Sequence, residues 1–358
     1  MSHDIIKLID RLAGPMLIPL LRRKKPVHGE FARSILLIRP GGIGDAVLLA
    51  PAIHSIKKTF PSLQIIVLAE QRNADVFPLI SGVNEVFCYD RPWEFIKALR
   101  GRYDVVIDTE QWHRLSAVVA CLTGAPMTIG YATNERQRLF SHPIPYSHDE
   151  YEVDSFCHLI EPLGIIVKVK ELPFLNISDT AERKAESLLG KFSEKPFIVI
   201  FPGSSISEKR WDMGRFVKLA SKLNQAGFPI IVIGSKEERA MGEEMTCGLD
   251  ALNLAGKTSL VETAALIDKS SLLVSGDSGV LHIAVGLGKP TVSLFGASNI
   301  KKWAPRGDRH IVINSNLHCS PCTRFGYTPK CAKNAKCMAD ITVEEVVVAV
   351  EKLIGNYR

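Results

Sequence analysis

The stretch LIRPGGIGDAVLLAPAI, residues 37–53, decides the fold. It contains the end of an apolar strand, a glycine-rich junction and the start of a helix. We expect the strand at 34–39 and the helix at 45–59, ending before Phe60 and Pro61. A buried strand that passes through a tight turn into a helix is the repeating unit of an α/β sheet.

The junction between strand and helix carries an unusual combination of residues. Gly41, Gly42 and Gly44 let the backbone and a ligand approach each other closely. Asp45 adds a carboxylate, which would repel a phosphate. Asp45 therefore suits a general base that takes a proton from a hydroxyl, or a cap of the following helix, and the residues alone leave both open. The glycine spacing is not G-x-G-x-x-G, which argues against a hydride-transfer enzyme.

The rest of the chain alternates between apolar runs of strand length and helical patterns. Strands, several with their following loops, are expected at 63–70, 83–90, 103–109, 197–205, 228–238, 251–259 and 271–275. Helices are expected at 93–100, 178–192, 213–226 and 343–356. This alternation predicts parallel sheets covered on both faces. The pattern weakens between about 134 and 174 and then restarts, so we expect one doubly wound domain at 31–175 and a second at 176–340.

Composition bounds the classes of function. The 358 residues carry a net charge of +6, and 7% of them are aromatic. These values exclude a dedicated nucleic-acid-binding protein and suit anionic substrates or an anionic membrane surface. No apolar stretch reaches the ~18 residues that a membrane-spanning helix needs.

The first 30 residues form a separate amphipathic and basic segment. Apolar residues fall at helical spacing at Ile5, Leu8, Ile9, Leu12 and Met16. Gly14-Pro15 and Pro19 interrupt this pattern, and four cations follow at 22–25. A secretory signal has the reverse order of charged and apolar residues. The segment is therefore either an interfacial anchor against acidic headgroups or a helix packed on the protein's own core.

Eight cysteines are present, and four of them cluster near the end of the chain: Cys319, Cys322, Cys331 and Cys337. The first two have the spacing of metal ligands, but the later gaps are irregular for a zinc ribbon. The cluster predicts a structural zinc site, or else reduced thiols or redox-dependent disulfides in a surface loop. The other four cysteines, scattered among apolar residues, are expected to be buried thiols.

Four loops of the second half follow expected strands and carry residues suited to a nucleotide diphosphate. They contain Ser204, Ser205 and Lys209; Glu238 or Glu237; Thr258, Ser259 and Leu260; and Asp277, Ser278, Gly279 and His282. The first loop offers hydroxyls and a cation to phosphate, the second a carboxylate to sugar hydroxyls, the third a surface for a base, and the fourth a helix N-terminus. Each loop alone is equally explained by helix caps and solvated charges. Together they predict a nucleotide-diphosphate pocket.

Two further signatures are missing from the sequence. The P-loop pattern G-x-x-x-x-G-K-[ST] is absent, which argues against ATP hydrolysis of that type. No Asp-x-Asp pair is present to hold a divalent metal on a diphosphate. The charge of a leaving diphosphate would then be met by Lys209, the hydroxyls and the helix terminus.

At these residues the sequence resembles glycosyltransferase family 9, the ADP-heptose:lipopolysaccharide heptosyltransferases. The resemblance covers about residues 34–356. Three ordered motifs carry it, IRPGGIGDAVLLAPAI, FPGSSISEKRW and SGDSGVLHIAVGLGKPTVSLFG, and DVVIDTEQWHRLSAVVACLTGAPMTIGY is a weaker fourth. It implies an α/β fold of GT-B architecture, with two Rossmann-like domains facing across a cleft and the last helix, 341–358, crossing back to the first domain.

The resemblance also implies a reaction, the inverting and metal-independent transfer of a heptose or related sugar from a nucleotide-diphosphate donor, ADP-heptose first, to a hydroxyl of a lipopolysaccharide core. Asp45 matches the family's base, Lys209 its phosphate-binding lysine and Glu238 its acidic residue. The residues from Asp277 to His282 match its donor loop. Such an enzyme would work in the cytoplasm of a Gram-negative bacterium, at the inner face of the membrane, on a lipid-linked oligosaccharide.

The acceptor side is less defined by the sequence. Arg114, Arg136 and Arg138 of the first domain are expected either to hold phosphates or acid sugars of the acceptor, beside the Gly41–Gly44 loop, or simply to be surface charges. Two other functions stay open. One is a nucleotide-sugar epimerase or hydrolase, which would consume donor without an acceptor. The other is a non-catalytic nucleotide-sugar binding protein.

Overall fold

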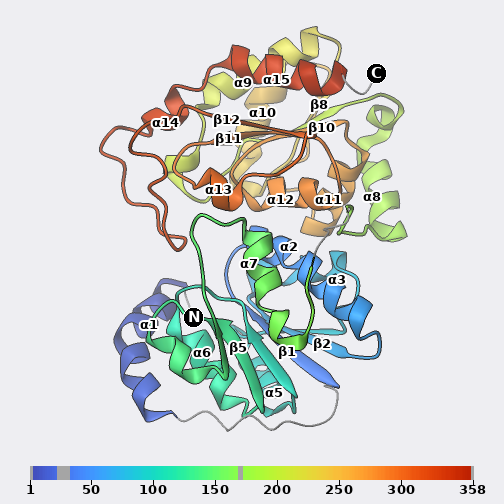
Figure 1. The fold of residues 1–358 in the computed structure, drawn as a ribbon. Helices are drawn as coiled ribbons and strands as arrows, with labels where there is room; N and C mark the ends of the chain where they lie inside the picture. Colours follow the sequence, from blue (N-terminus) through green and yellow to red (C-terminus); the bar gives the residue numbers. More distant parts are fainter. Residues whose placement is uncertain (1–2, 22–32, 168–171, 356–358) are drawn as a thin grey trace. The chain divides into compact units, whose positions relative to one another are not determined.

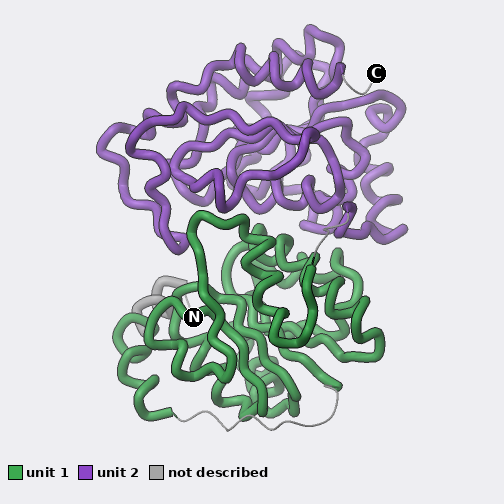
Figure 2. The backbone as a smooth tube through the Cα atoms, in the orientation of Figure 1, with its two compact units in different colours: residues 1–171 green, residues 172–358 purple. Residues whose placement is uncertain are grey.

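The computed structural model describes residues 3–21, 33–167 and 172–355. The chain divides into two compact units, 1–171 and 172–358, coloured separately in Figure 2. Each unit has its own parallel sheet, and each is described by itself below.

The sheet of the first unit has six strands in the order β3-β2-β1-β4-β5-β6 (Figure 1). These are β1 (Ser34–Arg39), β2 (Gln64–Ala69), β3 (Glu85–Cys88), β4 (Val105–Asp108), β5 (Met127–Tyr131) and β6 (His142–Ile144). Its helices are α1 (His3–Leu17), α2 (Ile43–Leu48), α3 (Ala50–Thr59), α4 (Gln71–Ala74), α5 (Pro92–Arg100), α6 (Arg114–Leu122) and α7 (Glu152–His158). All strands of β1 to β6 pair in parallel, and β1 is buried from Ile35 to Arg39, as a sheet covered on both faces requires.

The sheet of the second unit repeats this topology, with the order β12-β11-β10-β7-β8-β9. Its strands are β7 (Ile198–Phe201), β8 (Ile230–Val232), β9 (Ala251–Asn253), β10 (Leu272–Gly276), β11 (Thr291–Phe295) and β12 (His310–Asn314). Its helices are α8 (Asp179–Leu189), α9 (Met213–Gln225), α10 (Arg239–Thr246), α11 (Leu260–Lys269), α12 (Gly279–Gly286), α13 (Ile300–Trp303), α14 (Lys336–Ala339) and α15 (Val343–Gly355). The strand order of both sheets is that of a Rossmann domain, as the alternating pattern predicts.

The strand order creates a switch point in each sheet. In the first unit β1 lies between β2 and β4, and in the second β7 lies between β8 and β10. Connections from the two central strands leave in opposite directions, and in open α/β sheets of this kind ligands generally bind at the carboxyl ends of such strands. The loops after β1, β7 and β10 are the ones that carry Asp45, Lys209 and Asp277.

One local expectation needed correction. The helix expected at 45–59 begins earlier and is divided into α2 and α3, because Pro51 in the first turn of α3 cannot continue the hydrogen-bond ladder of α2. In addition, β6 and α7 lie in the stretch where the sequence pattern is weak.

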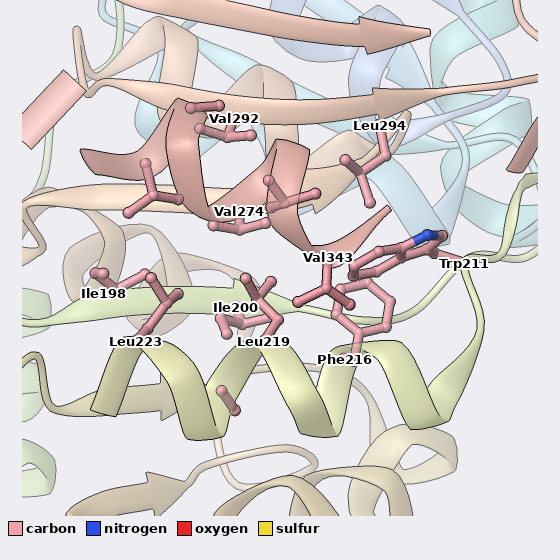
Figure 3. Packing of buried hydrophobic residues seen from close by; sticks show 14 of the residues in the cluster. Ile198, Ile200, Trp211, Phe216, Leu219, Leu223, Val274, Val292, Leu294 and Val343 are labelled. Carbon is pink, nitrogen blue, oxygen red and sulfur yellow. The ribbon is translucent and has the colours of Figure 1, made fainter. Parts of the chain in front are cut away.

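The position of the last helix also differs from the expectation. The family resemblance implies that it crosses back to the first domain. In the structure α15 packs on α9 within the second unit. Its apolar face, including Val343, joins the core that Trp211, Phe216 and the strands β7, β10 and β11 form (Figure 3). Burial of this face explains why α15 stays with the second unit.

The N-terminal helix continues through Pro15, so the proline does not interrupt it as expected. The basic residues 22–25 lie outside the described part of the chain. α1 packs on α6, and the buried carboxylate of Asp10 accepts hydrogen bonds from the backbone N–H groups of Arg114 (2.6 Å) and Leu115 (2.7 Å). Asp10 thus caps a helix that begins 104 residues later in the sequence.

Removal of this cap is expected to loosen α1. Asp10→Ala should lower the free energy of unfolding of the first unit by about 1–3 kcal/mol, because two helix N–H groups lose a charged acceptor. Hydrogen exchange at residues 114 and 115 should rise in step. Asp179→Ala, at an exposed position in the first turn of α8, is the control and should leave these amides unchanged. Unaltered exchange in Asp10→Ala would show that the cap does not hold α1.

Burial alone would raise the pKa of Asp10, but hydrogen bonds from His113 and the backbone of Leu115 outweigh it and hold the pKa below its usual value. The folded pKa lies below the unfolded value of 3.8, so the contribution of Asp10 to stability is complete above that pH. It is lost as the pH falls through the folded value.

Among the described residues, no helix combines the length and the apolar character needed to cross a membrane.

Candidate functional site

The loop after β1 brings Asp45 into the first turn of α2. The N-cap of α2 is Gly42. The alternative interpretation of Asp45 as the cap of this helix is therefore wrong. Gly41 has φ +105°, and a Cβ atom there would lie 3.2 Å from Arg39 Nη2. A Cβ atom at Gly42 would lie 3.3 Å from Asp45 Oδ2. Glycine is therefore required at both positions, because the side chains of Arg39 and Asp45 lie too close to the turn to leave room for a Cβ atom.

The cation is the buried guanidinium of Arg39. It donates to the carbonyl of Pro40 (Nε, 2.7 Å), to the carbonyl of Thr109 (Nη1, 3.0 Å) and to Glu110 Oε2 (Nη2, 3.4 Å). Burial would lower the pKa of Arg39, but the charges of Asp45 and Glu110 raise it above the ordinary value. Arg39 therefore stays charged and favours the ionised form of Asp45.

A third carboxylate, Glu152, completes this group. Glu152 is buried, accepts from Gln111 Nε2 (2.6 Å) and from the Tyr146 hydroxyl (3.2 Å), and also acts on the charge of Arg39. Burial and the charges of Glu152 and Asp45 raise the pKa of Tyr146, so its phenol is protonated. Three carboxylates around one guanidinium disfavour a phosphate and suit a neutral hydroxyl group.

Two of the three arginines expected to bind an acceptor have other partners. Arg136 is fully buried and donates to Asp108 Oδ2, to the carbonyl of Glu110 and to Ser116 Oγ (3.2 Å). It is therefore neither a surface charge nor presented to a ligand in this structure. Arg114 Nε binds Glu135 Oε1 at 2.5 Å, whereas Arg138 is exposed.

In the second unit, the loops after β7 and β10 meet at the switch point. Lys209, at the end of the 3₁₀ turn η6 (Ser207–Lys209), donates from Nζ to Asp277 Oδ2 at 2.7 Å. Ser298 Oγ donates to the same carboxylate oxygen. Burial would raise the pKa of Asp277, but the charge of Lys209 and the hydrogen bonds from Lys209 and Ser298 outweigh burial, and the pKa is lowered. Asp277 is therefore an anion that fixes Lys209, which keeps further N–H donors for a ligand.

The helix after Asp277 supplies a second anion-binding element. Ser278 is the N-cap of α12 and accepts from the N–H of Leu281 (3.2 Å), and Gly279 is the first helical residue. His282 is buried in the first turn, with Nε2 4.0 Å from Asp277 Oδ1. Burial lowers the pKa of His282 to about 4, so the ring is neutral. Its Nδ1 has no hydrogen-bond partner within the described residues.

The remaining candidate loops of the second unit lie against one another. Glu238 ends the 3₁₀ turn η7 (Lys236–Glu238) and accepts from the backbone N–H of Ser235 (2.8 Å). A Cβ atom at Gly203, in the loop of Ser204 and Ser205, would lie 2.8 Å from Glu238. A Cβ atom at Gly256 would lie 2.9 Å from the backbone of Lys236. The structure therefore brings the loops after β7, β8 and β9 together at one edge of the sheet.

Several of these residues also have local structural roles. Glu238 forms a capping box with Ser235, and Glu237 accepts from the hydroxyl of Ser235. Ser259 caps α11, next to Leu260, the first residue of that helix. The hydroxyl of Thr258 pairs with that of Thr263 at 2.8 Å. A helix cap and a ligand contact are compatible only where a second donor or acceptor is available.

Sequence reasoning missed Arg39, Glu152 and Ser298. Arg39 had a signal, since it is the one charge in the strand SILLIR. Ser298 follows β11, which pairs with β10, so the rule that strand-end loops meet at one edge would have found it. Glu152 lies in the region of weak pattern and carries no signal in the sequence.

The four clustered cysteines are free thiols in the structure. Burial raises the pKa of Cys322 and Cys337, with the neighbouring thiols adding to the rise. No three His, Cys, Asp or Glu side chains of the described residues are arranged to hold a metal ion. The thiols as placed do not fit the zinc site, which stays a prediction for metal analysis of protein purified without chelator. Cys247 is exposed, contrary to expectation.

Comparison with known proteins identifies relatives of this chain. The family model of glycosyltransferase family 9 (heptosyltransferase) matches residues 92–332, more than half of the chain, starting after the Asp45 loop. The chain is 29% identical over 337 residues to lipopolysaccharide heptosyltransferase 3 of Escherichia coli K12, covering 87% of this chain and 95% of that relative.

Solved structures agree on the fold. The structure of E. coli ADP-heptose lipopolysaccharide heptosyltransferase II superimposes with a TM-score of 0.74 at 23% identity, over 90% of this chain and 99% of that chain. E. coli heptosyltransferase WaaC with ADP-2-deoxy-2-fluoro heptose gives 0.67 at 16% identity, over 91% and 100%. These similarities confirm the GT-B fold of two Rossmann-like domains.

Proposed function

The chain belongs to glycosyltransferase family 9, and from this premise we propose that it transfers a heptose, or a related sugar, from a nucleotide-diphosphate donor to a hydroxyl of a lipopolysaccharide core. Transferase activity follows from the family. The donor, the acceptor and the inverting course of the reaction are proposals. The Lys209–Asp277 pair beside the N-terminus of α12 is the observation that supports a diphosphate donor, on which the rest of the proposal depends.

This part of the second unit suits a diphosphate. Lys209 brings a positive charge to the switch point, and Asp277 with Ser298 fixes its position. The first N–H groups of α12 have no acceptor within their own helix, and the helix dipole favours an anion there. ADP-heptose is the first candidate donor, because one solved relative is the E. coli WaaC complex with a fluorinated ADP-heptose.

We propose that the reaction is a single displacement. Asp45 takes the proton of the acceptor hydroxyl, and the oxygen attacks the anomeric carbon from the face opposite the diphosphate. The bond from that carbon to the phosphate oxygen breaks, and the nucleoside diphosphate leaves with its electron pair. Lys209 and the N-terminus of α12 stabilise the charge on the leaving group, so the residues present supply the stabilisation without a bound metal.

Incubation with a panel of nucleotide sugars, with and without Kdo-lipid A acceptors, tests the proposal by mass spectrometry of both products. We expect glycosylated acceptor together with free nucleoside diphosphate. Donor consumption without an acceptor would instead indicate the epimerase or hydrolase alternative. Binding of donor with no consumption in either mixture would indicate the non-catalytic alternative.

Loss of the lysine charge should weaken handling of the donor. Lys209→Ala is expected to lower kcat/KM for the donor roughly 10- to 100-fold, because a charge-assisted hydrogen bond is lost and Asp277 is left facing the diphosphate. Steady-state kinetics at varied donor concentration measures this. Lys222→Ala, at an exposed ion pair on α9, is the matched control. Wild-type kinetics in Lys209→Ala would remove Lys209 from the donor site.

The acceptor of such a reaction is lipid-linked, so we further propose that the protein works at the cytoplasmic membrane surface. The observation in favour is the exposed apolar character of α1, with Leu12 and Met16 directed away from the core. This supports the anchor interpretation of the first segment, although the Asp10 cap shows that α1 also packs on its own unit.

A further inference from the structure

The surface formed by α1, α5, α6 and the 3₁₀ turn η1 (Ile18–Leu20) is rich in exposed apolar side chains. More than half of the large exposed apolar side chains within the described residues lie on these elements. They are Leu12 (63% exposed), Met16 (73%), Leu20 (78%), Trp93 (83%), Ile96 (37%) and Leu122 (55%). Single exposed apolar residues are ordinary, but a concentration on one layer of helices marks an interaction surface.

These elements cover the same face of the first sheet. Ile18 of η1, Ala98 of α5 and Ala117 of α6 belong to one core cluster with Leu36 and Ile38 of β1. Side chains two apart on a strand point to the same face. The exposed apolar residues on the outer sides of these helices therefore share one layer, which we call the helical docking face.

Helical spacing places cations among these apolar residues. On α5, Trp93, Ile96, Lys97 and Arg100 recur at i, i+3, i+4 and i+7 and are all exposed, while Ala98 is buried. Arg11 is exposed beside Leu12 on α1. Two acids of this face, Glu85 and Glu94, are paired with cations, because Lys97 binds Glu85 at 2.8 Å and Arg91 binds Glu94 at 2.9 Å.

A hollow of about 600 Å³ opens in the same face, beside α5. Its apolar walls include Phe87, Trp93 and Ile96. Its charged residues are Arg100, Arg102 and Lys97, and the last of these is paired with Glu85, which also lines the hollow. An apolar floor with a cationic rim matches an anionic lipid, whose phosphate lies next to its acyl chains. Tryptophan is also the side chain that prefers the boundary between headgroups and hydrocarbon.

We propose that the helical docking face binds an anionic lipid bilayer through Leu12, Met16 and Leu20 on one side and Trp93 and Ile96 on the other. This inference rests on the proposed function in one respect, since a lipid-linked acceptor gives the docking its purpose. A second copy of the chain is the less suitable occupant. In a symmetric dimer centred on this face, Arg100 and Arg102 would meet like charges.

Vesicle sedimentation of the full chain tests the proposal. We expect binding to vesicles that contain phosphatidylglycerol and little binding to vesicles of pure phosphatidylcholine. Binding should weaken at about 1 M salt, because salt screens the attraction between exposed charges and the headgroups. Leu12→Gln/Met16→Gln/Leu20→Gln and, separately, Trp93→Gln/Ile96→Gln should each lower the partition coefficient about tenfold or more. Val348→Gln, an equally exposed apolar position on α15, should leave it unchanged.

Three outcomes would overturn the docking face. They are equal binding by all variants, binding independent of lipid charge, and a concentration-dependent dimer that the triple variant abolishes. Tryptophan fluorescence adds a direct readout, because a blue shift on vesicle addition should disappear in Trp93→Phe. Activity on a deacylated, water-soluble acceptor separates the two proposals. The docking variants should keep that activity, and its absence in the wild type would count against the proposed function alone.

Discussion

Asp45→Asn is expected to slow glycosyl transfer on the order of 10²–10⁴-fold while leaving the affinity for ADP unchanged. Asparagine has the shape of aspartate, so the turn around Gly41 and Gly42 can form, but its amide cannot take a proton at neutral pH. Affinity should persist because the nucleotide is assigned to the second unit. Single-turnover transfer and calorimetry with ADP measure the two quantities separately.

The position of Asp45 supports this expectation. The carboxylate follows the glycine turn, the buried guanidinium of Arg39 acts on it, and Glu110 and Glu152 surround the same guanidinium. A base needs an ionised carboxylate and a neutral partner. The charge of Arg39 favours the first, and the carboxylates around it disfavour a phosphate as the second. Asp75→Asn, at an exposed position after α4, is the control. Near-normal transfer by Asp45→Asn would reject the base and leave the donor site intact.

Much of the fold could be predicted from the sequence, because local sequence patterns indicate the strands and helices. The apolar runs that became β1, β2, β7 and β10 are buried on both faces, and such strands need no long-range information to be recognised. The division into two Rossmann-like units followed from the repetition of this pattern. The surface on which α15 packs could not be predicted, because an amphipathic pattern shows that a helix packs on the core but not which part of the core it contacts.

In the candidate site, too, the sequence indicated individual residues but not the contacts between them. Lys209 and Asp277 were both selected by sequence, but the bond between them joins residues 68 apart and exists because β7 and β10 are neighbours. Their assignment to a diphosphate remains a prediction. The ring of charges around Arg39 depends on three segments that are far apart in the sequence, so spacing alone could not predict it. The prediction for Arg136 was wrong. This arginine was expected either at the surface or in contact with the acceptor, and it is instead fully buried.

Arg136→Met is expected to lower the stability of the first unit by about 3–5 kcal/mol. The substitution removes the charge that compensates Asp108, and both side chains of this pair are completely buried. Ser116 and the carbonyl of Glu110 lose their donor in the same step. A shift of about 2–4 °C in the thermal transition is expected for each kcal/mol in a unit of this size. Differential scanning calorimetry measures that transition, and ADP affinity should be retained at lower temperature.

The adjacent exposed arginine gives a matched control, because Arg138→Met removes the same charge from the same turn without uncovering a buried carboxylate. Its transition should stay within about 1 °C of the wild type, as for other surface substitutions. The double variant Arg136→Met/Asp108→Leu should recover part of the loss, since an uncompensated buried charge costs more than an apolar pair. A stable Arg136→Met protein with a raised KM for the acceptor would contradict this account. It would return Arg136 to the acceptor role that the sequence first indicated.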